Sequence, residues 1–331
     1  MKEPLLSIIM PVFNTKSYLR NAFDNITEQI SGDVEMIIID DGSTDGSGKV
    51  CDEFAALIEN VIVVHQENAG VSSARNVGIE VSHGRYLWFC DSDDRVLPGA
   101  LSRLMLCLRT EEPQAVAFPV IQENDEGREL GLIPAPNGIG YGERGPLQSG
   151  DLLYPYAHVF RRDVIGSERF DTDLSLLEDR DFLYRVCQGI EGDISIIDEP
   201  LYAYLVTRKD SAVNSLPVNN YVIANDVQYR ILENELIEGR VEPAYTIATR
   251  NTLGVLAIIC KTGKCKDSFS RLRKRLLSFD KYAQDLTGLV VIKYNLCKCT
   301  PELYKFAYSA LGRFHRRQLP GESVVVHSAD S

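Results

Sequence analysis

Apolar and polar positions alternate with two different periods along residues 1–121. Short apolar runs rich in β-branched residues predict buried strands, and apolar residues recurring every three or four positions predict amphipathic helices. The predicted strands are Leu6–Phe13, Val34–Ile39, Val61–Val64, Tyr86–Cys90 and Ala115–Ile121. The predicted helices are Ser17–Ile30, a segment that carries Val50, Phe54, Leu57 and Ile58 with Thr44 or Asp45 as its cap, Ser72–Val81, and Pro98–Leu108. This alternation predicts an α/β fold, a doubly wound and mostly parallel sheet with helices on both faces.

Residues 122–150 break the pattern. Glycine and proline are dense there, which predicts loop rather than core. Gly140, Gly142 and Gly145 have the spacing of a dinucleotide-binding fingerprint. The match neither follows a clear strand nor opens a helix, so we interpret it as chance. A second α/β portion follows to about residue 206, and from Val218 the pattern is mainly helical.

Charge is distributed unevenly over the 331 residues, whose net charge is −12. Residues 221–331 hold 17 Lys+Arg against 11 Asp+Glu, whereas residues 1–220 hold 18 against 36. The acidic part argues against nucleic-acid binding, and the basic tail is compatible with an anionic partner. No apolar stretch is long enough to span a bilayer, and Met1–Pro4 does not begin an export signal. We therefore expect a cytoplasmic protein.

The eight cysteines fall into two groups. Four of them, Cys51, Cys90, Cys107 and Cys187, stand singly in apolar segments, as buried reduced thiols do. The other four, Cys260, Cys265, Cys297 and Cys299, could offer thiolates to zinc. Their spacing differs from the usual two-residue knuckle, so a zinc site is the less favoured interpretation.

Polar clusters follow three of the predicted strands. Asn14 ends the first strand, Asp40–Asp45 the second and Asp91–Asp94 the fourth. Ligands bind beyond the carboxyl ends of strands in an open parallel sheet, at the point where the strand order reverses. Any one cluster alone would be read as an Asp-rich turn or a helix cap. Three clusters at one sheet edge predict a ligand site.

Asp91 and Asp93 have the simplest chemical interpretation. Two carboxylates one residue apart offer hard oxygen ligands to Mn²⁺ or Mg²⁺ and leave positions for phosphate oxygens and water. Such a cation would neutralise a diphosphate leaving group. A calcium loop starting at Asp40 is excluded because its twelfth position is Cys51 rather than Glu.

Four ordered motifs resemble family 2 of the inverting glycosyltransferases, which have the GT-A fold. The motifs are Ser7–Asn14 (SIIMPVFN), Asp40–Asp45 (DDGSTD), Asn68–Asn76 (NAGVSSARN) and Asp91–Asp93 (DSD). The resemblance is strong over residues 5–110 and weaker over 155–212. It implies a Rossmann-like GT-A catalytic domain over residues 1–215. Residues 1–121 would bind the nucleotide-sugar, residues 122–215 would form the acceptor side, and residues 216–331 would be a helical extension.

The resemblance also implies roles for the matching positions. Those implied to bind the donor, a UDP-sugar, are Pro11, Val12, Asn14, Asp40, Asp41, Asn68, Gly70, Arg75, Asp91 and Ser92. The base and ribose would lie against Pro11, Val12 and Asn14, and Asp41, helped by Asp40, would bind the pyrimidine edge. Asp93 is implied to be the principal metal ligand, and Asp91 to bind the ribose or a metal-bound water. The alternative for Arg75 is a solvated helix residue.

The segment Leu176–Phe182 resembles the acidic motif of the family. By position Asp179 would be the catalytic base, which takes the proton of the acceptor hydroxyl as it attacks the anomeric carbon. Glu178 and Asp181 are its rivals within the motif. The structural alternative is an acidic first turn that the helix dipole favours.

Two further positions enter through the resemblance. In the loop that closes over the diphosphate, Arg208 or Lys209 would supply positive charge and Ser211 a hydroxyl. His158 stands where the family often has Lys, so an acceptor-side role and simple packing are both open for it.

The tail carries an apolar stripe at helical spacing, made of Leu303, Phe306, Ala307, Ala310, Leu311 and Phe314. Lys305, Arg313, Arg316 and Arg317 lie beside it. The stripe can pack on the catalytic domain or on the second subunit of a homodimer. It can also touch an anionic membrane as a peripheral contact at the inner face, which would suit a lipid-linked acceptor.

These observations predict an inverting, metal-dependent hexosyltransferase that uses a UDP-sugar and builds a surface polysaccharide or glycoconjugate on a glycan or lipid-linked acceptor. A sugar nucleotidyltransferase would need a glycine-rich, basic phosphate loop after the first strand, and Pro11–Asn14 is not one. A glycosidase with two carboxylates would need neither nucleotide nor metal. A non-catalytic nucleotide-sugar binding protein is disfavoured because candidates for both the metal ligand and the base are present.

Overall fold

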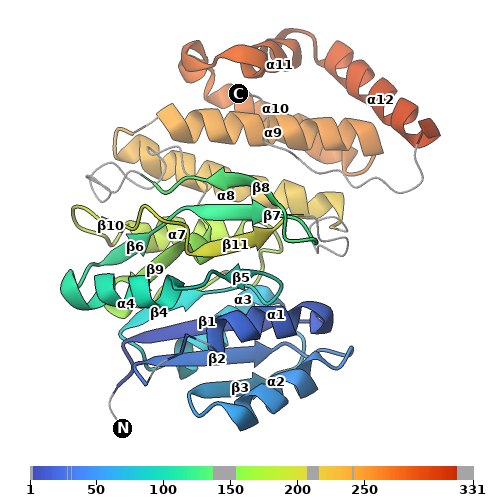
Figure 1. Ribbon diagram of the computed structural model, residues 1–331. Helices are drawn as coiled ribbons and strands as arrows, with labels where there is room; N and C mark the ends of the chain where they lie inside the picture. Colours follow the sequence, from blue (N-terminus) through green and yellow to red (C-terminus); the bar gives the residue numbers. More distant parts are fainter. Residues whose placement is uncertain are drawn as a thin grey trace. The chain divides into compact units, whose positions relative to one another are not determined.

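A computed structural model describes residues 3–136 apart from Glu28 and Ser31, and residues 154–206, 216–240 and 242–318. The chain divides into two compact units, Met1–Arg208 and Lys209–Ser331 (Figure 1). The first unit mixes strands and helices, and the described part of the second is helical.

Most of the first unit is built around one sheet. Its strand order is β10-β6-β9-β4-β1-β2-β3, with β1, β2, β3 and β4 parallel and β9 antiparallel to both of its neighbours. The strands are β1 Leu6–Val12, β2 Val34–Asp40, β3 Val61–His65, β4 Tyr86–Phe89, β6 Ala115–Ala117, β9 His158–Arg161 and β10 Ser195–Ile196. The α-helices are α1 Lys16–Thr27, α2 Ser47–Leu57, α3 Val71–Val81, α4 Ala100–Thr110, α6 Arg162–Ile165 and α7 Glu178–Cys187, and a 3₁₀ turn, η1, spans Pro155–Ala157. The expected mixed, mostly parallel α/β sheet is therefore confirmed.

A smaller sheet replaces two of the sequence predictions. The single strand expected over Ala115–Ile121 is wrong, because the chain leaves the main sheet after β6 and forms β7, Val120–Glu123, in another one. The start of the expected 122–150 loop is also strand, since β7 turns back into β8, Glu129–Ile133. The order of this sheet is β5-β11-β7-β8, with β5 at Arg95–Val96 and β11 at Tyr202–Leu205. Half of β8 is exposed, which explains why its composition resembles that of a loop.

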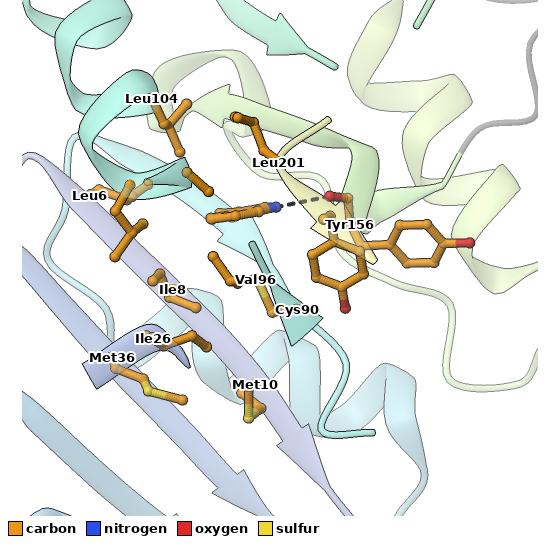
Figure 2. Packing of buried hydrophobic residues seen from close by; sticks show 14 of the residues in the cluster. Leu6, Ile8, Met10, Ile26, Met36, Cys90, Val96, Leu104, Tyr156 and Leu201 are labelled. Atoms are coloured by element: carbon orange, nitrogen blue, oxygen red, sulfur yellow. Dashed lines mark hydrogen bonds between the residues drawn. The ribbon is translucent and has the colours of Figure 1, made fainter. Parts of the chain in front are cut away.

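Both faces of the main sheet are covered, which explains the continuous apolar runs of its strands. Leu6, Ile8 and Met10 of β1 lie in the larger core, together with residues of α1 and α4 (Figure 2). The intervening Ile9 faces α3, where a Cβ on Gly78 would lie 2.3 Å from its Cγ2. Only glycine permits α3 to approach the sheet this closely.

The strand order reverses at β1, which lies between β2 and β4. Pairing of β1 with β4 ends at Ile9 and Phe89, whereas pairing with β2 continues through Pro11 to Val12. Pro11 therefore occupies a position where its missing N–H leaves no ladder bond unmade on the β4 side. Beyond this point the carboxyl ends of β1, β2 and β4 border the crevice in which open α/β sheets bind ligands.

The second unit packs its described helices around α9. The helices are α8 Val218–Ile237, α9 Glu242–Thr262, α10 Lys266–Ser278, α11 Gly288–Cys299 and α12 Pro301–Gln318, with a 3₁₀ turn, η3, at Asp280–Asp285 (Figure 1). Thr252 of α9 bonds Asn225 and Tyr229 of α8 inside the bundle, and Tyr304 of α12 donates to Leu253 O at 2.7 Å. In the described parts of the chain no helix is both long and apolar enough to cross a membrane.

The four cysteines of the second unit do not form a zinc site. Across the described residues, no three His, Cys, Asp or Glu side chains converge as metal ligands. Cys297 is buried and Cys299 is exposed, because the two are only two positions apart on α11 and point to different sides of it. All four thiols are unbridged.

Candidate functional site

Asp41 organises the loop that leads from β3 into α3. One carboxylate oxygen accepts hydrogen bonds from Gln66 Nε2 at 2.7 Å and from Ala69 N–H at 2.8 Å, and the other accepts from Gly70 N–H at 2.9 Å. Asp41 is buried, with 3% of its surface exposed. Asn68 and Gly70 remain exposed in the same loop. Asp41 therefore holds the loop in shape and leaves its outer residues open to a ligand.

The glycine after Asp41 joins two of the predicted motifs. Gly42 has φ +72°, and a Cβ there would lie 2.8 Å from Asn68 N. Any other residue at this position would be strained by the left-handed backbone, and its Cβ would collide with Asn68 N. The turn after β2 and the loop before α3 are therefore packed backbone against backbone.

Asn14 joins the ends of β1 and β2. It has φ +52°, its N–H donates to Ser43 Oγ at 3.1 Å, and its Oδ1 accepts from Thr44 N–H at 2.8 Å. Asn tolerates this left-handed conformation better than most residues. Pro11 and Val12 are buried beneath it, whereas the side chain of Phe13 is 46% exposed. The exposed aromatic residue of this motif is thus one that the sequence interpretation left out.

Asp40 bonds both the turn that follows β2 and His65 at the end of β3. Its Oδ1 accepts from Ser43 N–H at 3.1 Å, and its Oδ2 lies 2.8 Å from His65 Nδ1. His65 Nε2 in turn lies 3.0 Å from Asp52 on α2. Hydrogen bonds to Asp40 and Asp52 raise the pKa of His65 above its usual value. Asp40 therefore fastens the turn after β2 to the end of β3 through His65.

Asp45 accepts hydrogen bonds at the starts of two helices. Its Oδ1 accepts from the N–H and the hydroxyl of Ser47 at the start of α2, and its Oδ2 accepts from Lys16 N–H at the start of α1. The cap predicted at Thr44 or Asp45 is wrong by at least one residue, because Gly46 is the cap residue of α2, although Asp45 does accept from the first N–H of the helix. A carboxylate beside two helix N-termini also complements both helix dipoles.

The turn after β4 is fixed by a residue that the sequence interpretation missed. Asp94 is 5% exposed and accepts hydrogen bonds from Tyr202 Oη and Leu205 N–H, both at 2.9 Å. Tyr202 Oη also accepts from Asp91 N–H at 2.9 Å. Burial, with the charges of Asp93 and Asp91, raises the pKa of Asp94 well above its ordinary value. Only tertiary structure could reveal this role, because β11 lies more than a hundred residues away.

The three residues of the DSD motif differ in exposure. Ser92 is buried, and its hydroxyl lies 3.0 Å from Thr15 Oγ1 beyond the end of β1. Asp91 and Asp93 are half-buried at the sheet edge. The motif therefore presents two carboxylates at the edge and uses its serine to fasten the turn to the β1 side.

Arg75 joins α3 to both candidate acidic motifs. It is 5% exposed, its Nη2 donates to Asp91 Oδ1 at 2.8 Å, and its Nη1 lies 3.7 Å from Glu178 Oε1. Its guanidinium carbon stands 5.2 Å from the centre of the Phe170 ring. The alternative of a solvated helix residue is wrong.

Glu178, Asp179 and Asp181 stand in the first turn of α7. Burial and the charge of Asp179 raise the pKa of Glu178 to about 7, against the opposing charge of Arg75. Burial also raises the pKa of Asp179, whose Oδ1 accepts from Arg180 N–H at 2.6 Å. Asp181 is 3% exposed and pairs with Arg185 at 2.9 Å, one helical turn on. The geometry therefore leaves Glu178 and Asp179 as the accessible carboxylates of the motif.

His158 has the surroundings of a packing residue. It is 1% exposed, its Nδ1 lies 2.9 Å from Tyr154 O, and its ring stacks on Phe160 at 5.6 Å. Burial lowers its pKa to about 4. A neutral imidazole inside β9 favours packing over an acceptor-side role.

Four tyrosines from two segments form another feature that the sequence did not reveal. Tyr156 stacks on Tyr154 at 5.1 Å, on Tyr202 at 5.0 Å and on Tyr204 at 5.4 Å. The hydroxyl of Tyr202 belongs to the Asp91–Asp94 turn, and Tyr154 senses the charge of Asp179. The stack therefore reaches the β4 turn through Tyr202 by rigid aromatic contacts.

The residues at the edge fit a divalent cation that a diphosphate helps to hold. Asp91 and Asp93 supply hard carboxylate oxygens, the ligands that Mn²⁺ and Mg²⁺ prefer. No third acidic, His or Cys side chain joins them in the described residues. Phosphate oxygens and water would therefore complete the coordination. Arg208, Lys209 and Ser211, which the resemblance places over the diphosphate, lie outside the described residues.

Comparison with known proteins shows similarity to one family and to solved structures that share the fold. The family model for glycosyl transferase family 2 matches residues 7–166. A relative is the minor teichoic acid biosynthesis protein GgaB of Bacillus subtilis, 37% identical over 211 residues, which are 62% of this chain and 23% of GgaB. The chain spans less than two thirds of the length of curated relatives that it matches.

Solved structures share the fold at low sequence identity. TarS 1–349 from S. aureus in complex with UDP-GlcNAc has a TM-score of 0.61 and 16% identity, covering 97% of this chain and 94% of that one. The mannosyltransferase PcManGT from Pyrobaculum calidifontis in complex with GDP-Man and Mn²⁺ has a TM-score of 0.52 and 13% identity, covering 96% and 89%. The expected GT-A fold with a carboxyl-terminal extension is confirmed.

Proposed function

We propose that this chain, whose residues 7–166 match the model of glycosyl transferase family 2, transfers a hexose from a UDP-sugar to an acceptor hydroxyl with inversion. The observation that carries the proposal is the meeting of Asp91 and Glu178 on one buried arginine, Arg75. This contact joins the candidate donor side at the end of β4 to the candidate base motif at the start of α7.

The nucleotide would lie over the ends of β1 and β2. Phe13, Asn14, Asn68 and Gly70 are exposed there, on a frame that Asp41 holds rigid. An exposed aromatic ring suits the face of a base, and exposed amides suit its hydrogen-bonding edge. TarS 1–349, which has a similar fold, was solved in complex with UDP-GlcNAc, and this supports a uridine donor.

Asp93 and Asp91 would hold the divalent cation, which neutralises charge on the diphosphate leaving group when it is bound. The Mn²⁺ in PcManGT supports this assignment. Arg75 keeps Asp91 oriented, and Tyr202 and Asp94 keep its backbone in place.

Asp179 would act as general base. The acceptor oxygen attacks the anomeric carbon from the face opposite the diphosphate, its proton passes to the Asp179 carboxylate, and the bond to the diphosphate oxygen breaks to release UDP. A raised pKa suits this step, because a base is most effective when its pKa lies near the working pH. Asp181 is paired with Arg185, and Glu178 stands 3.7 Å from the guanidinium of Arg75, which favours Asp179 as the base.

The product would be a surface polysaccharide or a teichoic-acid-like glycoconjugate, built on a glycan or lipid-linked acceptor in the cytoplasm. The similarity to GgaB supports this class of product. A non-catalytic nucleotide-sugar binding protein and a nucleotidyltransferase are the alternatives. Neither would need an acidic motif that Arg75 links to the DSD motif.

Calorimetry with UDP tests the donor site. Binding should be at least tenfold tighter with Mn²⁺ than with EDTA, because a shared cation removes charge repulsion between Asp93 and the diphosphate. Asp93→Ala should abolish this difference. Equal affinity under all three conditions would remove the metal-dependent donor site.

The exposed face of α12 supports a second, weaker proposal, peripheral contact with an anionic membrane. Leu303 and Phe306 are 55% and 64% exposed, whereas Tyr304 between them is buried in the helical unit. Flotation of the chain with phosphatidylglycerol vesicles, compared with Leu303→Ser/Phe306→Ser, tests it. If the variant instead changes from dimer to monomer in light scattering, the stripe is a subunit contact.

A further inference from the structure

Arg75 stands in an aromatic and acidic setting that a nucleotide contact alone does not explain. Phe170, under its guanidinium, stacks on Phe182 of α7 at 3.8 Å and lies 5.3 Å edge-on from Phe89 of β4. The next residue on α3, Asn76, grips the backbone of Phe170, donating to its oxygen at 2.9 Å and accepting from its N–H at 2.8 Å. Consecutive residues of α3 therefore fasten the segment that leads into α7.

The guanidinium has more hydrogen-bonding capacity than it uses. Within the described residues, its Nε and Nη1 are buried without a hydrogen-bond partner. Nη1 stands 3.7 Å from Glu178 Oε1, which is close enough for an ion pair and too far for a hydrogen bond. One full contact to Asp91 and one incomplete contact to Glu178 place a single cation between two acidic motifs.

Three carboxylates share the field of this one cation. The charges of Asp91, Glu178 and Asp179 all act on Arg75. A diphosphate donor would bring further negative charge to the same edge. Without Arg75, unpaired carboxylates in a partly buried site would repel that charge strongly, since buried charges are poorly screened.

We propose that Arg75 is a positioning residue that couples the donor site to the base motif, by neutralising Glu178 while it orients Asp91. The proposal deepens the donor-site assignment and rests on it. Arg75 acts through the two carboxylates rather than by contact with the reacting atoms. Its loss should therefore be partly repaired by removing the carboxylate that it leaves unpaired.

A double-mutant cycle on UDP binding tests the coupling. Calorimetry at pH 8 with UDP and Mn²⁺ is performed on the full chain, Arg75→Met, Glu178→Gln and the double variant. Arg75→Met should weaken binding about tenfold, and adding Glu178→Gln should recover most of this loss, a coupling within the range of residues in one network. Arg75→Lys should keep part of the affinity, because it retains the charge without the fork.

Arg162→Met is the matched control. Arg162 is a half-buried arginine whose Nε donates to Gly84 O at 2.8 Å and whose Nη2 donates to Ser82 Oγ at 3.0 Å, at the opposite end of the strands. It should lower the unfolding temperature and leave UDP affinity unchanged. If Arg75→Met also lowers only the unfolding temperature, or if Glu178→Gln restores no affinity, Arg75 is purely structural. If the wild-type chain binds no UDP, the donor-site proposal is itself wrong and this one falls with it.

Discussion

Two groups of acidic residues occupy the same sheet edge. One is surrounded by hydrogen-bond donors, and the other by further negative charge. Asp40, Asp41 and Asp45, after β2, accept hydrogen bonds from backbone N–H groups of the loops around them. Around β4 and α7 the acids crowd one another instead. Burial and neighbouring charge raise the pKa of Glu178 to about 7 and that of Asp94 well above its ordinary value.

The difference separates carboxylates that stabilise the fold from carboxylates suited to proton transfer or cation binding. A carboxylate that accepts several backbone N–H bonds is stabilised in its charged form and fixes the fold around it. A carboxylate whose charge is disfavoured by burial and like charges is ready to take a proton or to meet a cation. We therefore expect substitutions in the β2 group to cost stability, and those of Glu178 and Asp179 to cost function. Asp94 holds the β4 turn through Tyr202 Oη and Leu205 N–H, so its substitution should cost stability as well.

The largest effect is expected for Asp179→Asn. Transfer from a UDP-sugar, measured as UDP release, should fall by about 10²–10⁴-fold, the usual contribution of a general base. In the wild type the rate should rise with pH through the raised pKa of Asp179, since only the carboxylate accepts a proton. The variant should lose that rise. UDP binding should persist.

The thermal stability of Asp179→Asn should not fall along with its activity. A folded-state pKa raised above the unfolded value means that the charged carboxylate destabilises the fold at neutral pH. Asp179→Asn should therefore unfold at the same temperature as the wild type or higher. Near-normal transfer in Asp179→Asn together with its loss in Glu178→Gln would move the base to Glu178 and contradict the assignment.

The next effect in size is expected for Asp41→Ala. Two N–H groups, of Ala69 and Gly70, lose their acceptor, and because both residues are exposed, water can replace it and each lost bond costs about 0.5–1.5 kcal/mol. Urea denaturation should show a loss of about 1–3 kcal/mol. Glu53→Ala, in an exposed pair with Lys49, is the control and should stay within about 0.5 kcal/mol. A stable Asp41→Ala variant would mean that the loop does not depend on this carboxylate.

The contrast between the two groups also explains what could be predicted from the sequence. The strands, the helices and the polar ends of β1, β2 and β4 follow from local periodicity and from a shared sheet edge. The split of Ala115–Ile121 between two sheets does not, because both halves have the same apolar character. Whether a strand stays in a sheet depends on neighbours such as β9 and β11 that are distant in sequence.

The candidate site was likewise predictable only as far as residue types reveal it. Asp91, Asp93, Arg75 and Asp179 could be named by motif, and their roles remain predictions. The latch of Asp94 on Tyr202 and the tyrosine stack on Tyr156 depend on contacts between segments that no local pattern encodes. His158 shows the converse, a polar residue in a matching position whose burial favours packing.

The smallest effect is expected at His65, where the β2 group touches solvent. His65 is bonded to Asp40 and Asp52, and its side chain is 48% exposed, so screening limits the contribution to about 0.5 kcal/mol. Because its folded pKa is raised above the unfolded value of about 6.5, this stability is fully present below pH 6.5 and is lost as the pH rises through the folded pKa.

Urea denaturation at pH 6 and pH 8.5 should show that loss in the wild type and not in His65→Gln. An NMR titration of the imidazole should give a pKa above that of an exposed histidine. An ordinary pKa, or the same pH dependence in both proteins, would mean that the two carboxylates hold His65 by hydrogen bonds alone.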